Sequence, residues 1–235
     1  MTAYTLKLIA IITMFLDHLG AIFFPQAQFL RMIGRLAFPI FAFFIAEGAF
    51  HTKSLEKYIL RMLSFAVLTE LIFDFAFNGI FFDWGHQNVM WTFVLALLPI
   101  YIYQKLSPEK QNGIIFWGLG LVFMVTAYYM QTDYDAWGVL FVLNFYYFRN
   151  QKGKQFLFAF LMCFYHGIVA TLVYGMFHPL FFLQSLAAVS LILLATYNGQ
   201  KGSNLKYFFY WFYPGHLLLF ALIKYYPSLI SLSGM

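Results

Sequence analysis

The sequence predicts an all-α fold, a polytopic transmembrane helical bundle. Of the 235 residues, 63% are hydrophobic and only 10% are charged, and the mean hydropathy is +0.75. Such values are typical of proteins that cross a bilayer several times and exclude an ordinary soluble domain. We therefore expect one integral-membrane domain, residues 1–235, in the cell membrane.

Hydrophobic segments follow one another along the whole chain, each close to the ~20 residues that a spanning helix needs. We count about nine of them, within a range of about eight to ten, because the sixth is short and the eighth begins at a proline. The segments are Leu6–Phe24, Phe29–Phe50, Tyr58–Asn78, Val89–Leu106, Gly113–Met130, Trp137–Phe148, Gln155–Tyr174, Pro179–Tyr197 and Tyr207–Tyr225.

Basic residues gather around the even-numbered loops, whereas the odd-numbered loops contain no lysine. The basic residues are Lys53, Lys57, Arg61, Lys105, Lys110, Arg149, Lys152, Lys154, Lys201 and Lys206. Positively charged loops stay in the cytosol, so we expect a cytosolic N-terminus and an external C-terminus. The net charge of +5 is then a topology signal, and no nucleic-acid partner is expected.

Ionisable residues lie inside several of these apolar segments. They are Asp17, His18, Arg31, Arg35, Glu70, Asp74 and His216, with Glu47 near the far end of the second segment. Such groups are costly in a bilayer and usually mark a pathway or a reaction site. At ~1.5 Å per residue, His18 and Glu70 both lie roughly 18 Å from the cytosolic edge. We therefore expect one polar slab in the middle-to-outer half of the membrane.

Asp17 and His18 are adjacent, hence about 100° apart on a helix, and cannot face each other as a dyad. The first hairpin turns near Gln26, which sets Asp17 level with Arg35 and predicts an ion pair between them. Arg31, one turn nearer the outer surface, has no evident acidic partner in the hairpin. It is the better candidate for binding an anionic group bidentately.

Glu70 and Asp74 are four residues apart and share a helix face, where two carboxylates repel unless a cation, a proton or an arginine lies between them. Both could belong to a site. Equally, one could pair with an arginine of the second segment while the other caps a helix end.

His18 is the strongest candidate for chemistry, because a neutral imidazole can act as a general base. A membrane histidine is, however, more often a hydrogen-bonding partner between helices. His216 follows Pro214 and Gly215, which we expect to interrupt the helix where it lines a cavity.

Four further candidates for substrate binding lie at the outer ends of segments: Gln87, Asn88, Asp133 and Tyr134. Capping of a helix is the simpler role for Asn88, and a plain turn is the simpler role for Asp133 and Tyr134. No metal site is expected, because the histidines lack ligand spacing and Cys163 is the single cysteine.

At these same residues the chain resembles a known family. In KLIAIITMFLDHLGAIF, RMIGRLAFPIFAFFIAEGAFHTKSLEKYILRMLSFAVLTELIFDF, HQNVMWTF, DYDAWGVL and KYFFYWFYPGHLL it is similar to the TraX family. That family is named for conjugative F-pilin acetylation and belongs to a broad group of polytopic membrane acyltransferases. The likeness runs in order from Lys7 to Leu218 and is strongest up to Phe75.

The resemblance implies an enzyme that moves an acyl group from cytosolic acetyl-CoA, or another acyl-CoA, to an amine or hydroxyl at or across the membrane. The acceptor stays open between a protein N-terminus, a glycan and a lipid. His18 would deprotonate the acceptor or carry the acyl group, and the arginines would bind or polarise an anionic group. Asn88 or Gln87 would steady the carbonyl oxygen.

Two other functions fit the buried charges. In a small secondary transporter or proton-coupled permease, the intramembrane Asp, His and Arg groups would form a relay. In a non-catalytic assembly factor, they would serve helix association alone.

Overall fold

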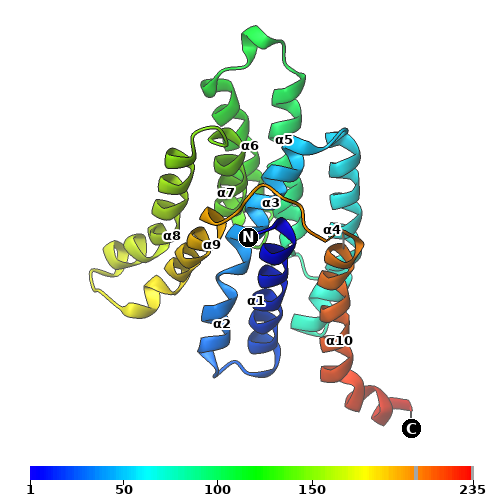
Figure 1. Cartoon of the computed structure of the whole chain (residues 1–235). Coiled ribbons are helices and arrows are strands. Elements are labelled where there is room, and N and C mark those ends of the chain that lie inside the picture. Colours follow the sequence, from blue (N-terminus) through cyan, green and yellow to red (C-terminus); the bar gives the residue numbers. More distant parts are fainter. Residues whose placement is uncertain (204–205, 234–235) are drawn as a thin grey trace. The chain divides into compact units, whose positions relative to one another are not determined.

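The computed structural model describes residues 1–203 and 206–233, and these residues form helices joined by loops (Figure 1). Within these ranges there is no strand, and β pairing is limited to one isolated bridge between Gln87 and Thr132. The all-α fold class is therefore confirmed.

The helices follow one another in a simple order along the chain. They are α1 (Ala3–Phe23), α2 (Gln28–Gly34), α3 (Ala37–His51), α4 (Leu55–Asn78), α5 (Val89–Lys105), the 3₁₀ helix η1 (Pro108–Lys110), α6 (Gly113–Tyr129), α7 (Asp135–Tyr147), α8 (Lys152–Tyr174), the 3₁₀ helix η2 (Pro179–Ala188), α9 (Val189–Ala195) and α10 (Lys206–Ser233).

Contacts divide the chain into two compact units. The first unit comprises Met1–Phe41, Leu71–Phe82 and Phe160–Met235, and the second comprises Ala42–Glu70 and Asp83–Ala159. The helices α3, α4 and α8 each contribute residues to both. Whether the chain acts as the single domain expected from the sequence stays a prediction.

In the first unit, α1 packs against both α2 and α10. A cap fixes the start of α1, because the Thr2 hydroxyl accepts a hydrogen bond from the Thr5 N–H at 3.3 Å. Near its end, Gly20 lets α2 approach closely, since a Cβ there would lie 2.8 Å from the Cβ of Leu30. The hairpin of α1 and α2 thereby holds one face of α1 while α10 covers another.

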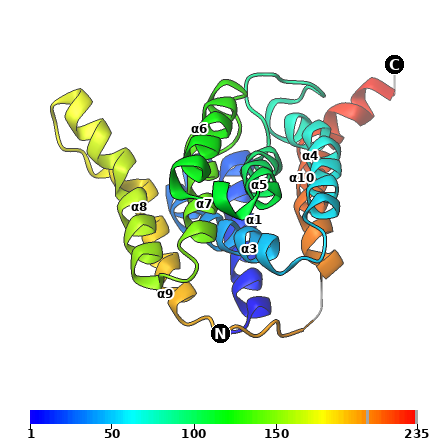
Figure 2. The same ribbon diagram turned by 90° about the horizontal axis from the view of Figure 1, so that it is seen from above.

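In the second unit, α5, α6 and α7 pack against one another and lie side by side in both views (Figures 1 and 2). Leu97, Phe116 and Val142 are buried there. The buried Asn144 is also satisfied in part, because its side-chain amide donates to the Gln155 carbonyl oxygen at 3.0 Å. Apolar packing with internally paired polar groups is what a bilayer demands of its proteins.

Three helical stretches of the described residues are long and apolar enough to cross a membrane. They are Ala3–Phe23, Gln28–His51, which comprises α2 and α3, and Lys152–Tyr174. Shorter apolar helices cover Val89–Lys105, Gly113–Tyr129 and Pro179–Ala195. Several apolar helices are therefore confirmed, whereas a count of about nine spans stays a prediction.

The second predicted segment, Phe29–Phe50, is not one unbroken helix. It breaks between α2 and α3 at Arg35 and Leu36, whose N–H groups turn back to the carbonyls of Met32 and Ile33. Pro39 supplies the physical reason, because a proline ring clashes with the carbonyl four residues earlier, here that of Arg35. The break places Pro39 in the first turn of α3, where proline is tolerated.

The interruption expected at Pro214 and Gly215 is wrong, because α10 runs through both residues. A proline inside a helix removes a single backbone hydrogen bond, and packing against neighbouring helices can offset that loss. α5 likewise contains Pro99 without a break. The eighth predicted segment, Pro179–Tyr197, instead begins with the 3₁₀ turns of η2 before α9.

Candidate functional site

The polar residues of α1 point to two different neighbours. Asp17 faces α2, where it meets arginines, and His18 faces α10, where it meets a second histidine. Their ~100° separation on the helix explains why adjacent residues serve two separate groups. Both groups belong to the first unit.

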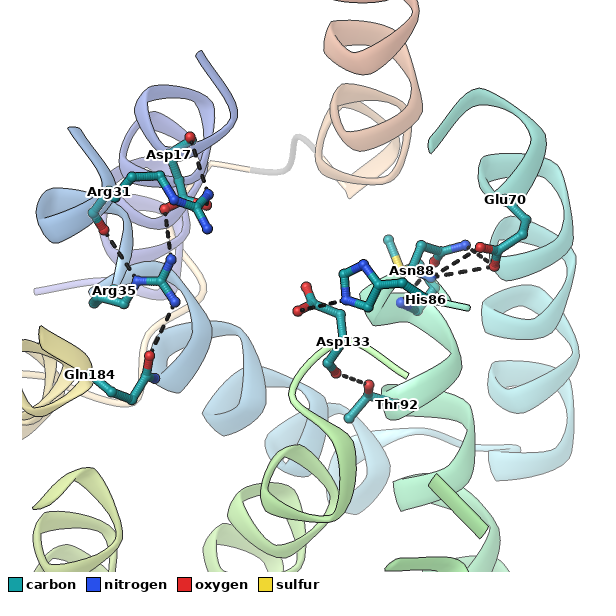
Figure 3. Close-up of polar contacts among 10 residues, drawn as sticks. Asp17, Arg31, Arg35, Glu70, His86, Asn88, Thr92, Asp133 and Gln184 are labelled. Atoms are coloured by element: carbon teal, nitrogen blue, oxygen red, sulfur yellow. Dashed lines mark hydrogen bonds and ion pairs between the residues drawn. The ribbon is translucent and has the colours of Figure 1, made fainter. Parts of the chain in front are cut away.

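Asp17 bridges two arginines (Figure 3). Nη1 of Arg31 donates to Oδ2 of Asp17 at 2.6 Å, and Nη2 of Arg35 donates to Oδ1 at 3.2 Å. The predicted Asp17–Arg35 ion pair is therefore present. The expectation that Arg31 lacks an acidic partner is wrong, because residues four apart on a helix share a face and a carboxylate offers two oxygens.

Further contacts fix this arrangement, which we call the arginine cluster (Asp17, Arg31, Arg35 and Gln184). Arg35 donates from Nη1 to the side-chain oxygen of Gln184 at 3.1 Å and from Nε to the Arg31 carbonyl oxygen at 3.2 Å. Gly34 leaves room for the carboxylate, since a Cβ there would lie 2.2 Å from Oδ1 of Asp17. Nothing in the sequence pattern had singled out Gln184 or Gly34.

Arg31 keeps hydrogen-bonding capacity in spite of its ion pair. Its side chain is 39% exposed. Within the described part of the chain, only its Nη1 donates hydrogen bonds, to Asp17. The Nε and Nη2 groups can therefore donate to an anionic ligand while Asp17 holds the guanidinium in place.

His18 and His216 form a buried pair, which we call the histidine pair. Nδ1 of His18 lies 2.6 Å from Nε2 of His216. The two rings are almost parallel, with an interplanar angle of 5° and centroids 4.9 Å apart. Nδ1 of His216 in turn lies 2.7 Å from the carbonyl oxygen of Phe212, one turn earlier on α10. The structure thus brings together two histidines that lie 198 positions apart.

Glu70 and Asn88 meet in the second unit (Figure 3). Glu70 accepts hydrogen bonds from the Asn88 side-chain amide at 2.7 Å, from the Asn88 backbone N–H at 3.2 Å and from the Trp91 indole N–H at 2.5 Å. Asn88 caps α5, because its side-chain oxygen accepts from the Met90 N–H at 2.9 Å. The capping role considered for Asn88 is confirmed, and Glu70 accepts hydrogen bonds from the start of α5.

Two loops of the same unit are joined by their backbones. The Gln87 N–H donates to the Gln131 carbonyl at 3.0 Å, and the Asp133 N–H donates to the Gln87 carbonyl at 2.8 Å. The Thr92 hydroxyl also donates to the Asp133 carbonyl (Figure 3). Tyr134 follows with a positive φ of 64°, as a tight turn requires. The structure therefore gathers Gln87, Asn88 and Asp133 at one place through contacts that shape the loops.

Asp74 is fully buried on α4 and belongs to the first unit. No three His, Cys, Asp or Glu residues among those described are placed to hold a metal ion. The catalytic and substrate-binding roles of all these residues stay predictions.

The chain has relatives among known proteins. It is 29% identical to "Probable fimbrial assembly protein FimC, serogroup H1" of Dichelobacter nodosus, and the match covers 95% of this chain and 96% of that protein. An uncharacterized protein of Rickettsia prowazekii is 34% identical over 68 residues, which is 29% of this chain and 27% of that protein. No solved structure matches the chain.

The family comparison covers nearly the whole chain. The sequence pattern described as "TraX protein" matches residues 2–224, which include the arginine cluster, the histidine pair and the loops around Asn88 and Asp133. The resemblance seen in the sequence is thereby confirmed: this chain belongs to the TraX family.

Proposed function

We propose that this protein is a membrane acyltransferase, which moves an acetyl or other acyl group from acyl-CoA to an amine or hydroxyl acceptor. Membership of the TraX family is compatible with a transferase. One observation carries the proposal: two adjacent residues of α1 hold a candidate base and orient a candidate anion-binding arginine. His18 faces a second imidazole, and the residue before it holds an accessible arginine.

The proposed reaction has two proton steps. His18 accepts the proton of the acceptor amine or hydroxyl as that group attacks the thioester carbonyl carbon of the donor. The tetrahedral intermediate then collapses, the carbon–sulfur bond breaks, and the coenzyme A thiolate takes the proton from His18. Arg31 binds an anionic group of the donor or acceptor through Nε and Nη2, and Asp17 keeps the guanidinium oriented.

The acceptor that we propose is a protein N-terminal amine. The relative from Dichelobacter nodosus, matched over 96% of its length, is named for fimbrial assembly, and the resemblance described in the sequence analysis implies pilin acetylation. A pilin-like subunit delivered through the membrane would present such an amine. A glycan or lipid hydroxyl would undergo the same chemistry, and the assay below separates these acceptors.

We propose a multi-pass topology with a cytosolic N-terminus and an external C-terminus, supported by the basic residues of the even-numbered loops. The single cysteine makes a direct test simple, because one replacement, Cys163→Ala, removes all native thiols. In that background, Ser107→Cys should be protected from an impermeant maleimide in intact cells, and Trp84→Cys should be labelled. Both residues are exposed in the structure. The reverse pattern would overturn the orientation.

The decisive assay uses protein in nanodiscs with acetyl-CoA and a pilin-like N-terminal peptide. Free coenzyme A and the acetylated peptide are measured together. Removing a general base by His18→Gln should lower the rate by about 10²–10⁴-fold. His178→Gln, which changes a histidine of the loop before η2, serves as the matched control and should stay near the wild-type rate.

Several results would count against the proposal. An unchanged rate in His18→Gln would remove His18 from the mechanism. Acetylation of added glycan or lipid, with no product on the peptide, would replace the proposed acceptor. Absence of acyl transfer, together with solute uptake into proteoliposomes lacking acyl-CoA, would establish the transporter instead.

A further inference from the structure

We propose that His216 selects the tautomer of His18, so that Nε2 of His18 is the basic nitrogen of the proposed acyl transfer. His216 is then a positioning residue and a proton relay. This inference rests on the proposed function for its catalytic meaning, but the tautomer itself can be measured without turnover.

The Phe212 carbonyl can accept a hydrogen bond but cannot donate one. Nδ1 of His216 lies 2.7 Å from this oxygen. At that distance two lone pairs would repel each other, so Nδ1 of His216 must carry the hydrogen. The neutral ring therefore has its lone pair on Nε2.

That lone pair points at His18. Nδ1 of His18 lies 2.6 Å from Nε2 of His216, so His18 must be the donor in this bond. Both rings are buried, which favours the neutral form of each because a charge there would lose its hydration. Neutral His18 with its hydrogen on Nδ1 keeps a lone pair on Nε2. Within the described part of the chain, His18 Nε2 makes no hydrogen bond.

Aromatic rings pack around both imidazoles and hold their orientation. His216 is flanked by Phe15, Phe212 and Phe220, with ring centroids 6.0, 5.1 and 5.7 Å away. Phe77 meets the His18 ring edge-on, with a centroid distance of 5.7 Å. A flip of either imidazole would break at least one of the two hydrogen bonds and disturb these contacts. Packing therefore selects one orientation, and the orientation selects one tautomer.

The pair also provides a path for charge. When the acceptor O–H or N–H bond breaks, an N–H bond forms at Nε2 of His18 and its ring becomes cationic. The Nδ1 hydrogen can then shift to Nε2 of His216, which moves the positive charge onto that ring, where Nδ1–H donates to the Phe212 carbonyl. The reverse shift restores His18 as the coenzyme A thiolate takes up the Nε2 proton. Both histidines thereby return to their starting protonation states.

The first test reads the tautomer directly. Protein labelled with ¹⁵N-histidine in nanodiscs is examined by NMR, and His18→Gln and His216→Gln each remove one set of signals for assignment. We expect hydrogen on Nδ1 of His18 and none on Nε2, and hydrogen on Nδ1 of His216. A spectrum with hydrogen on Nε2 of His18 would overturn the inference, whatever the enzymatic activity of the sample.

The second test replaces His216 with amide side chains of two different lengths. A glutamine oxygen can occupy the place of Nε2, whereas an asparagine oxygen falls nearer the place of Nδ1. His216→Gln should therefore keep the His18 tautomer and remain within about tenfold of the wild-type rate, while His216→Asn should lose about 10²-fold or more. The ¹⁵N signals of His18 are recorded in both variants.

These results separate the inference from the proposed function. Equal rates in the glutamine and asparagine variants would overturn the role of His216 while leaving acyl transfer intact. A wild type that releases no coenzyme A would overturn the proposed function, and the spectrum would still decide the tautomer.

Discussion

Glu70 and Asp17 are both carboxylates in apolar helices, yet their surroundings differ. Glu70 accepts hydrogen bonds from uncharged N–H donors of Asn88 and Trp91 at the start of α5. Asp17 is bound by the guanidinium groups of Arg31 and Arg35, and Arg31 still has donors to offer. An acidic residue within an apolar segment is therefore not by itself a sign of chemistry. Its partners decide whether it binds a helix end or orients a charged side chain.

Removing the carboxylate of Asp17 should have the largest effect on stability. Asp17→Ala leaves two partly buried guanidinium groups without the bridging charge, and we expect a loss of about 3–5 kcal/mol in stability. Thermal unfolding in detergent measures the loss. The double variant Asp17→Ala/Arg31→Ala should lose less than the sum of the two single variants, because the two residues interact. Additive losses would contradict the bridging role.

Glu70→Gln changes the other carboxylate, which accepts hydrogen bonds from the start of α5. It weakens the hydrogen bonds to the start of α5, so we expect a loss of about 1–3 kcal/mol in stability. The acyl-transfer rate per folded molecule should not change. Glu56→Gln, an exposed position on the same helix, is the matched control and should affect neither quantity. A large fall in the rate at wild-type stability would place Glu70 in the site after all.

Gly34→Ala tests how tightly the arginine cluster is packed. The new methyl group would overlap the Asp17 carboxylate, since a Cβ would lie 2.2 Å from Oδ1. We expect a loss of about 1–3 kcal/mol. Gly118→Ala, with nothing within 4 Å of its Cβ, should instead gain about 0.5–1 kcal/mol from helix propensity. Equal behaviour of the two variants in thermal unfolding would contradict the close approach.

Arg31→Lys should have the smallest effect. A lysine can keep the ion pair with Asp17, but it loses the planar fork that could bind an anion at the same time. We expect an acyl-transfer rate about tenfold lower, which corresponds to one hydrogen bond of about 1.4 kcal/mol. The melting temperature should hardly change. Arg61→Lys, on the exposed surface of α4, is the control. An unchanged rate would assign Arg31 to helix association alone.

Local signals in the sequence predicted much of the first hairpin. The turn near Gln26 and the equal spacing of Asp17 and Arg35 from it predicted their ion pair, which the structure contains. The break at Arg35 was missed, although Pro39 supplied a signal for it. The opposite error occurred at Pro214, where a proline signal was present and α10 continues. A proline predicts strain in a helix, but neighbouring packing decides whether the helix breaks.

The sequence by itself determined that this chain is helical and apolar, that charge lies within its segments, and that it belongs to the TraX family. These properties follow from composition, from periodicity and from residues close together in the chain. Only the tertiary structure decided which polar groups meet: Gln184 with Arg35, Glu70 with Asn88, and His18 with His216. These partners come from different helices, and a buried polar group takes whichever donor or acceptor the packing brings within about 3 Å.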